Sequence, residues 1–227
     1  MTGSLTVVRI ENVKDIFKKK TGFSVKKDFS LENYEFQLNK LGEPLTEIFY
    51  CDSTPEYHIY LSKLSTNTIE RPIYIYKDGI EEYTLGYQEI KEFKFLIDTD
   101  FTTLYIFAPK RIARPFQARL DKEDYLRCSK IIFDFSRLQE LSNFITGYGT
   151  WEDSDGVITK TGKFGHGIET TIENFSMITA FYIDYSYKNK RVQLILNVEG
   201  RISTTNELTE DDLLYLYNEI KDTLVKK

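Results

Sequence analysis

Residues 178–198 read ITAFYIDYSYKNKRVQLILNV and decide the predicted fold. They contain two runs rich in aromatic and β-branched residues, Ile178 to Tyr187 and Arg191 to Val198, which flank the short polar link Lys188-Asn189-Lys190. Such runs favour β-strands, and a short polar link between two of them favours a hairpin. We therefore expect two adjacent antiparallel strands in this stretch.

A second stretch with the same arrangement occurs earlier in the chain. Phe93 to Ile97 and Leu104 to Phe107 are strand-like runs on either side of Asp98-Thr99-Asp100. A segment able to form a helix follows each predicted hairpin, at Pro109 to Leu120 and at Thr209 to Val225. Antiparallel strands with separate helices are typical of the α+β class. We therefore expect an α+β fold built mainly from antiparallel sheets with flanking helices.

The helix predicted at Thr209 to Val225 has the strongest local support. Thr209 and Asp212 approximate a capping box, in which each side chain satisfies a backbone N–H at the start of a helix. Apolar residues then recur at helical spacing, at Leu213, Leu214, Tyr217, Ile220 and Leu224. Because this spacing places them on one face, we expect the helix to be amphipathic and to face the core.

The composition is that of a globular protein rich in strands. The chain has 227 residues, of which 41% are hydrophobic and 29% charged, and it contains 16 Tyr and 16 Phe. A chain of this length buries a large core without metals or disulfides. It has no apolar run of the ~18 residues that a membrane helix needs, and no visible secretory signal. We therefore expect a cytoplasmic protein that does not enter a membrane.

The two halves of the sequence show a related order of elements. In the first half Leu5 to Ile10 is strand-like, Asn12 is suited to cap a helix, and Gly22 is suited to end it. In the second half Ile131 to Phe135 is strand-like, and a helical pattern follows from Ser136 to Gly147. We therefore expect two related halves, each with the order strand, helix, several antiparallel strands, helix.

The boundary between these halves is predicted in the charged segment Asp121 to Lys130. The expected domains are an N-terminal α+β half, residues 1–125, and a C-terminal α+β half, residues 126–227, which ends in the amphipathic helix. No linker rich in Pro and Ser separates them. We therefore expect the two halves to pack together.

Two kinds of catalytic site are disfavoured by the residues present. A zinc site would have to use the few Cys and His residues of the chain, and their spacing matches no zinc finger: Cys51, His58, Cys128 and His166. A serine hydrolase of the α/β type needs a Gly-x-Ser-x-Gly elbow, which the chain lacks. We therefore expect no metal and no cofactor.

A glycine-rich stretch is the most unusual local sequence. It contains Gly162, Gly165, His166 and Gly167, in a spacing that fits neither the P-loop nor the dinucleotide fingerprint. We interpret it as a hairpin loop, since glycine tolerates left-handed turns. The functional alternative is a loop in which His166 and Glu169 act as acid and base.

A metal-dependent nuclease is a further alternative. Asp78 followed by Glu92 and Lys94 has the order of acids and lysine that hold Mg²⁺ and stabilise the phosphate in such enzymes. Asp134 and Asp184 are alternative ligands, since both lie in predicted strands. An acid-x-lysine triplet also occurs often by chance in a chain rich in Glu and Lys.

One local cluster is strongly basic although the net charge of the chain is −5. Residues 101–120 contain no acid and four cations, Lys110, Arg111, Arg114 and Arg119. Cations in such a cluster bind the phosphates of nucleic acid. The alternatives are a solvated helix face and charge pairing with the acidic second half.

These observations favour a non-catalytic binding protein that acts through protein–protein contacts. Abundant Lys, Ile, Asn and Tyr, which have AT-rich codons, favour a microbial source, and an accessory, immunity or defence role lies within this class. The first alternative is a nucleic-acid-binding module that uses the four cations of the basic cluster. The second is the metal-dependent nuclease.

Overall fold

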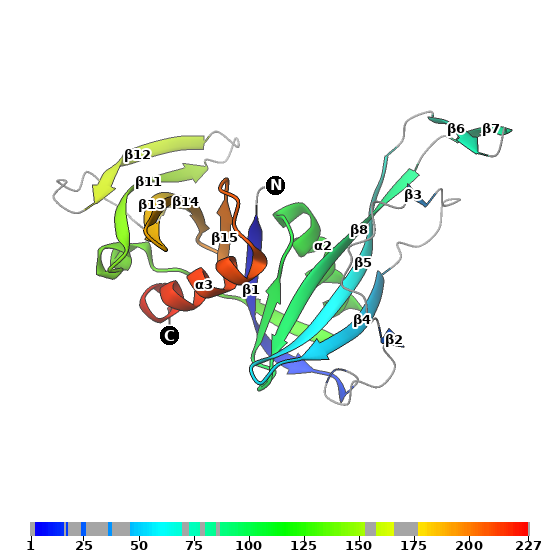
Figure 1. Cartoon of the computed structure of the whole chain (residues 1–227), viewed down its shortest axis with the longest axis horizontal. Helices are drawn as coiled ribbons and strands as arrows, with labels where there is room; N and C mark the ends of the chain where they lie inside the picture. Colours follow the sequence, from blue (N-terminus) through cyan, green and yellow to red (C-terminus); the bar gives the residue numbers. More distant parts are fainter. Residues whose placement is uncertain are drawn as a thin grey trace. The chain divides into compact units, whose positions relative to one another are not determined.

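The computed structural model describes residues 3–15, 17, 24–25, 36–37, 46–69, 73–77, 80–84, 87–152, 158–165 and 177–226. These residues form mainly antiparallel sheet, with a few helices (Figure 1). The predicted α+β class with mainly antiparallel sheets is therefore confirmed. No helix in this described part of the chain is long and apolar enough to cross a membrane.

The elements are named as in Figure 1. The described strands are β1 (Ser4–Val13), β2 (Ser24–Val25), β3 (Phe36–Gln37), β4 (Thr46–Ser53), β5 (Tyr57–Ile69), β6 (Ile73–Lys77), β7 (Ile80–Thr84), β8 (Tyr87–Asp98), β9 (Thr103–Ile106), β10 (Leu126–Lys130), β11 (Phe144–Glu152), β12 (Ile158–Gly165), β13 (Ala180–Tyr187), β14 (Lys190–Asn197) and β15 (Arg201–Thr204). The described helices are α2 (Lys110–Lys122), α3 (Glu210–Leu224) and the 3₁₀ helix η1 (Phe135–Glu140).

The chain divides into two compact units. Unit 1 consists of Met1–Arg9, Phe107–Pro109 and Ser129–Lys227, and unit 2 consists of Ile10–Ile106 and Lys110–Cys128. Strands β1 and β10 therefore contribute residues to both units. The domains predicted from the sequence, 1–125 and 126–227, stay a prediction.

Unit 1 contains a sheet in which neighbouring strands are antiparallel, in the order β12-β11-β13-β14-β15-β1. The hairpin predicted from residues 178–198 is confirmed as β13 and β14. Lys188 and Asn189 form its two-residue link and have positive φ angles of 47° and 61°. Both central residues of a type I′ turn have positive φ, a geometry that matches the twist of the flanking strands.

One face of this sheet is covered by α3 and η1. Side chains alternate along a strand, and Phe181, Ile183 and Tyr185 of β13 all lie buried on the covered face. Tyr187 and Tyr185 donate hydrogen bonds to carboxylates of α3, at 2.7 Å and 3.4 Å. Phe135 of η1 lies 5.4 Å from Phe181, centroid to centroid. The apolar stripe predicted for α3 is confirmed in part, since Leu213, Tyr217, Ile220 and Leu224 are buried.

In unit 2, neighbouring strands are antiparallel in the order β9-β8-β5-β4, and β2 pairs with β4 in parallel. These strands and those of unit 1 belong to one sheet, in which β1 is followed by β9. The hairpin predicted around Asp98-Thr99-Asp100 is confirmed as β8 and β9. The Asp98 carboxylate stabilises its turn by accepting the N–H groups of Thr102 and Thr103, at 2.6 Å and 3.1 Å. Strands β6 and β7 form a separate two-stranded antiparallel sheet.

Helix α2 packs on the sheet of unit 2 through an aromatic cluster. Phe116 contacts Phe93 and Phe95 of β8, with ring centroids 4.9 Å and 5.1 Å apart. Tyr60 of β5 stacks on Phe95 at 5.0 Å. The helix predicted at Pro109 to Leu120 is therefore confirmed, and it continues through Pro115.

The prediction for residues 131–147 is wrong. Residues 131–134 form no regular strand, and the expected helix from Ser136 to Gly147 is replaced by η1 and the start of β11. Asp134 caps η1, since its carboxylate accepts the Ser136 N–H and hydroxyl at 3.2 Å and 2.6 Å. The duplication into related β-α-β(n)-α halves is not confirmed, because this segment lacks the expected strand and helix.

The helix predicted to start at Asn12 also differs from the structure. Strand β1 continues to Val13, so Asn12 lies in a strand, while Asp15 and Phe17 are helical. The expected end of this helix at Gly22 lies outside the described residues. Asn12 therefore does not cap the helix, and β1 is longer than its apolar run indicates.

Candidate functional site

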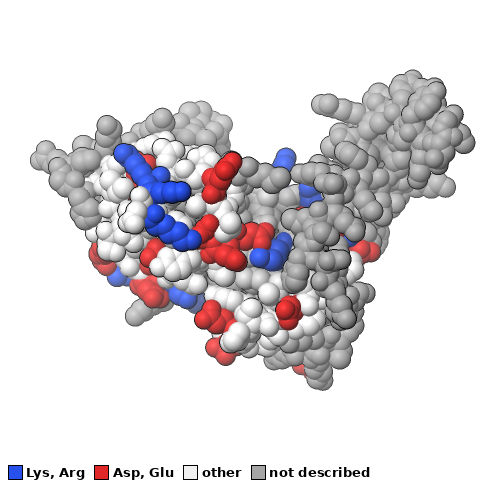
Figure 2. All heavy atoms as spheres, in the orientation of Figure 1, with Lys and Arg blue, Asp and Glu red and all other residues white. Residues whose placement is uncertain are grey.

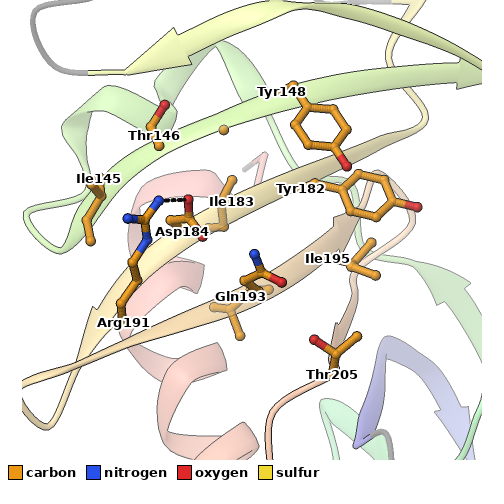
Figure 3. A pocket seen from close by; sticks show the side chains of 12 residues that line it. Ile145, Thr146, Tyr148, Tyr182, Ile183, Asp184, Arg191, Gln193, Ile195 and Thr205 are labelled. Carbon is orange, nitrogen blue, oxygen red and sulfur yellow. Dashed lines mark hydrogen bonds and ion pairs between the residues drawn. The ribbon is translucent and has the colours of Figure 1, made fainter.

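A cavity of about 690 Å³ lies against the face of the unit 1 sheet opposite to α3. Its walls come from β11, β13 and β14 and from Thr205 just after β15 (Figure 3). We call this cavity the tyrosine groove after its two aromatic residues, Tyr148 and Tyr182. Its volume is within the range of about 300–1,000 Å³ that is typical of binding sites for small ligands.

Sheet register places the apolar part of the groove in one row across three strands. Tyr148 of β11 pairs with Tyr182 of β13, and Tyr182 pairs with Ile195 of β14. The two tyrosine rings are stacked, with centroids 5.0 Å apart and planes inclined by 3° (Figure 3). All three side chains are half-buried. The row therefore forms a partly exposed aromatic and aliphatic strip.

A polar row lies beside this strip. Thr146, Asp184 and Gln193 are neighbours across the same three strands, and Arg191 forms an ion pair with Asp184 (Figure 3). The Arg191 side chain is 63% exposed and the Asp184 side chain 16%. The hydrogen bond to Asp184 raises the pKa of Arg191 above its ordinary value, so the guanidinium stays charged. The groove therefore offers amide, hydroxyl and guanidinium groups next to apolar surface.

Gly147 allows β11 to approach β13 closely beneath the groove. A Cβ atom at this position would lie 2.5 Å from the Tyr182 carbonyl oxygen and 2.9 Å from Cγ2 of Ile183. Real Cβ atoms do not approach other atoms so closely, so a side chain would push the two strands apart. The glycine between Thr146 and Tyr148 therefore helps to set the spacing on which the tyrosine stack depends.

The groove supports binding by shape, stacking and hydrogen bonding. Within the described residues, no three His, Cys, Asp or Glu side chains come together in a group able to hold a metal ion. Tyr and Arg, both present here, are enriched at protein interfaces. Ile145 at the edge of the groove is 39% exposed, which is unusual for a large aliphatic side chain among the residues that the structure describes.

The residues of the nuclease alternative have structural contacts where they are described. Glu92 of β8 forms an ion pair with Lys63 of β5 at 2.7 Å, and these two residues are cross-strand neighbours. Lys94 lies two residues further along β8, and Asp78 lies outside the described residues. Of the alternative ligands, Asp134 caps η1 and Asp184 pairs with Arg191.

The glycine-rich stretch is a strand where it is described. Gly162 and Gly165 lie in β12, which pairs with β11, so the loop predicted there is wrong for these two residues. A Cβ atom at Gly165 would lie 2.9 Å from the Ile145 carbonyl oxygen, which explains a glycine at this close approach of two strands. His166, Gly167 and Glu169 lie outside the described residues.

The remaining Cys and His residues have no ligand geometry in the described part of the chain. Cys51 and Cys128 form no disulfide and are half-buried. Burial raises the pKa of Cys128 to about 12, so this thiol is protonated at neutral pH. The ring of His58 packs against Phe101, 5.1 Å between centroids.

The four cations of the basic cluster all lie on α2. Lys110, Arg111 and Arg114 are exposed, and Arg119 is half-buried at the side of the helix. The helix thus brings three of the four predicted binding residues to one surface. This surface belongs to unit 2 and is separate from the tyrosine groove in unit 1.

Sequence reasoning missed the tyrosine groove because it assigned a helix up to Gly147. That assignment hid β11, which supplies Ile145, Thr146 and Tyr148. The pattern Ile-Thr-Gly-Tyr-Gly-Thr-Trp at residues 145–151, rich in residues that favour strands, was the available signal. No protein-family model matches the chain, and the curated proteins include no significant match to it.

Proposed function

We propose that this chain is a non-catalytic binding protein that acts through protein–protein contacts and holds its partner in the tyrosine groove. The observation that carries the proposal is the partly exposed row Tyr148-Tyr182-Ile195 beside the Arg191–Asp184 pair. An accessory role in a microbial system is the class of function that this activity fits.

The chemistry of the row favours a protein partner. Tyr supplies a large contact area at a small loss of side-chain freedom, and Tyr and Arg dominate the residues whose loss weakens protein complexes most. A stable interface buries about 800 Å² on each partner, so the groove supplies its apolar centre and the polar row supplies part of its rim. A small organic ligand is the rival occupant, and the experiment below separates the two.

The test is site-specific photo-crosslinking in the cells from which the protein comes. A benzophenone amino acid replaces Gln193, which is exposed within the groove, so that the tyrosine stack is left intact. We expect a discrete protein adduct at this position. We also expect the Tyr182→Ala and Ile195→Ala substitutions to abolish it, because they remove the apolar row.

The matched control carries the same amino acid at Tyr215, which is 54% exposed on α3. An equal adduct from both positions, or an adduct that survives Tyr182→Ala, excludes the groove as the binding surface. An adduct with a mass below about 1 kDa, a size typical of organic ligands rather than proteins, excludes the protein partner.

We also propose an internal duplication, in which the hairpin and the helix that follows it in the first half of the chain are related to those in the second half. The hairpin β8–β9 is followed by α2, and the hairpin β13–β14 is followed by β15 and α3. The proposal predicts that the backbone of β8–β9–α2 superposes on that of β13–β14–α3, with the helix on the same side of each hairpin. A helix on opposite sides excludes it.

A cytoplasmic location is the last part of the proposal. It rests on the sequence, and the reduced thiols of Cys51 and Cys128, which form no disulfide, fit a reducing compartment. Fractionation of the source cells tests it, with the protein expected in the cytosolic fraction.

A further inference from the structure

Helix α2 has one buried side and one basic side. Ile112, Ala113, Phe116 and Leu120 are buried against unit 2. With 3.6 residues per turn, Lys110, Arg111 and Arg114 lie within about a third of the helix circumference, on the opposite side. They are exposed, and the rise of the helix spreads them over about 6 Å along its axis.

Helix α2 itself contributes little negative charge to this side. The first turn of α2 has no acid, and the helix has a single acid, Asp121, in its last turn. Asp121 lies 3.8 Å from Arg127, with which it forms an ion pair. The three exposed cations therefore form a local positive surface at the N-terminal half of the helix. We call these three residues the α2 basic face.

The position of these cations is unfavourable for the helix itself. The N-terminus of a helix carries a partial positive charge, so the charges of Lys110 and Arg111 in the first turn weaken the helix. Sequences that break a local rule in this way often do so for function. An anion bound at this end would remove the repulsion.

We infer that the α2 basic face binds the phosphate backbone of nucleic acid. The inference rests on charge complementarity between these exposed cations and a dense row of anions, and on Arg111, since a guanidinium group binds phosphate oxygens in a bidentate manner. The neighbouring exposed residues, Pro115 and Ala118, are small, so the phosphate backbone of a nucleic acid can lie close to the helix. A lipid surface fits less well, because the apolar side of α2 is buried in the protein.

The binding is a local effect. The net charge of the whole chain is −5, and Figure 2 shows acidic and basic side chains intermixed on the face in view. Three phosphate contacts predict that the logarithm of the binding constant falls with the logarithm of salt concentration with a slope of about −2.7. The affinity then falls on the order of 40-fold between 50 and 200 mM salt.

Fluorescence anisotropy of the full chain with a labelled 20-base-pair DNA duplex of mixed sequence, and with a single-stranded RNA of the same length, tests the inference. We expect salt-dependent binding of one or both probes, with a slope of about −2.7 for the duplex and about −2.1 for the single strand. We expect the triple variant Lys110→Gln, Arg111→Gln, Arg114→Gln to lose at least about tenfold in affinity at 50 mM salt and to have a slope near zero.

The matched control is Lys130→Gln, Lys190→Gln, Lys226→Gln, which removes the same charge from exposed positions in unit 1. It should bind like the unchanged protein. Circular dichroism checks that both triple variants are folded. The α2 variant should melt at an equal or higher temperature, because the repulsion at the helix end is removed.

Three results would overturn the inference. They are no salt-dependent binding to either probe, equal losses in the two triple variants, and competition by polyglutamate as strong, per charge, as by unlabelled nucleic acid. The last result points to an acidic protein partner. The crosslinking experiment on the tyrosine groove is independent, because it uses residues of unit 1 alone.

Discussion

Gly147 shows how much a single residue decides in this protein. Its missing side chain leaves room for the Tyr182 carbonyl oxygen, 2.5 Å from where a Cβ atom would lie. We expect Gly147→Ala to destabilise the protein by about 1–3 kcal/mol, as overpacking between two paired strands does. Urea unfolding measures this loss. Ser186→Ala, on an exposed position of β13, is the control and should change stability by less than about 0.5 kcal/mol.

We expect Asp212 to make the stability of the protein depend on pH in the acid range. Its hydrogen bond from Lys188, then those from Tyr187 and Thr209, hold the pKa of this carboxyl well below its ordinary value. A group with a lowered folded-state pKa stabilises the protein above its unfolded-state pKa of about 4, and this stability is lost as the pH falls further. The melting temperature of the unchanged protein should therefore fall more steeply below pH 4 than that of Asp212→Asn.

The comparison variant for this effect is Asp211→Asn, which removes the same charge from the same turn but leaves the capping box. Its melting temperature should follow the pH curve of the unchanged protein. Parallel curves for Asp212→Asn and the unchanged protein down to pH 2.5 would show that Asp212 does not titrate as described.

At the scale of the element, α3 depends on a complete capping box. The Thr209 hydroxyl accepts the Asp212 N–H at 3.1 Å, and the Asp212 carboxylate accepts the Thr209 N–H at 3.1 Å. We expect Thr209→Ala to cost about 1 kcal/mol in urea unfolding, whereas Thr209→Ser keeps the hydroxyl and most of the stability. Equal stability of the Ala and Ser variants would contradict a role of the cap.

Helix α2 contains a residue that works against it. Pro115 is exposed in the interior of the helix and has no N–H for the carbonyl of Arg111. We expect Pro115→Ala to raise the free energy of unfolding by about 1–3 kcal/mol. The alanine restores the helix hydrogen bond, and this stabilises the protein more than the greater flexibility of the unfolded chain destabilises it. Ala118→Gly, exposed on the same helix, should lower it by about 1 kcal/mol. A Pro115→Ala variant less stable than the unchanged protein would contradict this account.

At the scale of the whole molecule, the path of the chain predicts a single cooperative unfolding transition. β1 pairs with β15 at Ser4 and Ser203 in unit 1, and its Ile10 N–H donates to the Thr102 carbonyl in unit 2. Unfolding of either unit therefore removes hydrogen-bond partners from part of β1, a strand that also belongs to the other unit. Fluorescence of Trp151, the single tryptophan, reports on unit 1, and far-ultraviolet circular dichroism reports on both units.

We expect the two signals to give the same midpoint in urea. Phe95→Ala removes a fully buried ring from unit 2, and it should lower the free energy of unfolding by about 3–5 kcal/mol. Both urea midpoints should therefore fall together. A shift in circular dichroism with an unchanged fluorescence midpoint would instead support two independently folding domains, as expected from the boundary near residue 125.

The candidate site was less predictable than the fold. The two hairpins, α2 and α3 rest on local patterns, such as the apolar runs around Lys188-Asn189-Lys190 and the cap at Thr209, and the structure contains these four. The groove depends on Tyr148 and Tyr182, which become neighbours only through the pairing of β11 with β13. Local patterns carry no information on which strands pair. The basic cluster was visible because its residues lie close together on one helix.

The sequence alone determined the α+β class, the two long hairpins, α2 and α3, because each of these follows from periodicity, turn residues or caps within a short stretch. The tertiary structure decided that residues 144–152 are a strand and not the end of a helix, and that β1 serves both units. The physical reason is that a strand is stabilised by partners distant in the chain, here β12 and β13 on either side of β11, and these partners outweigh local preference.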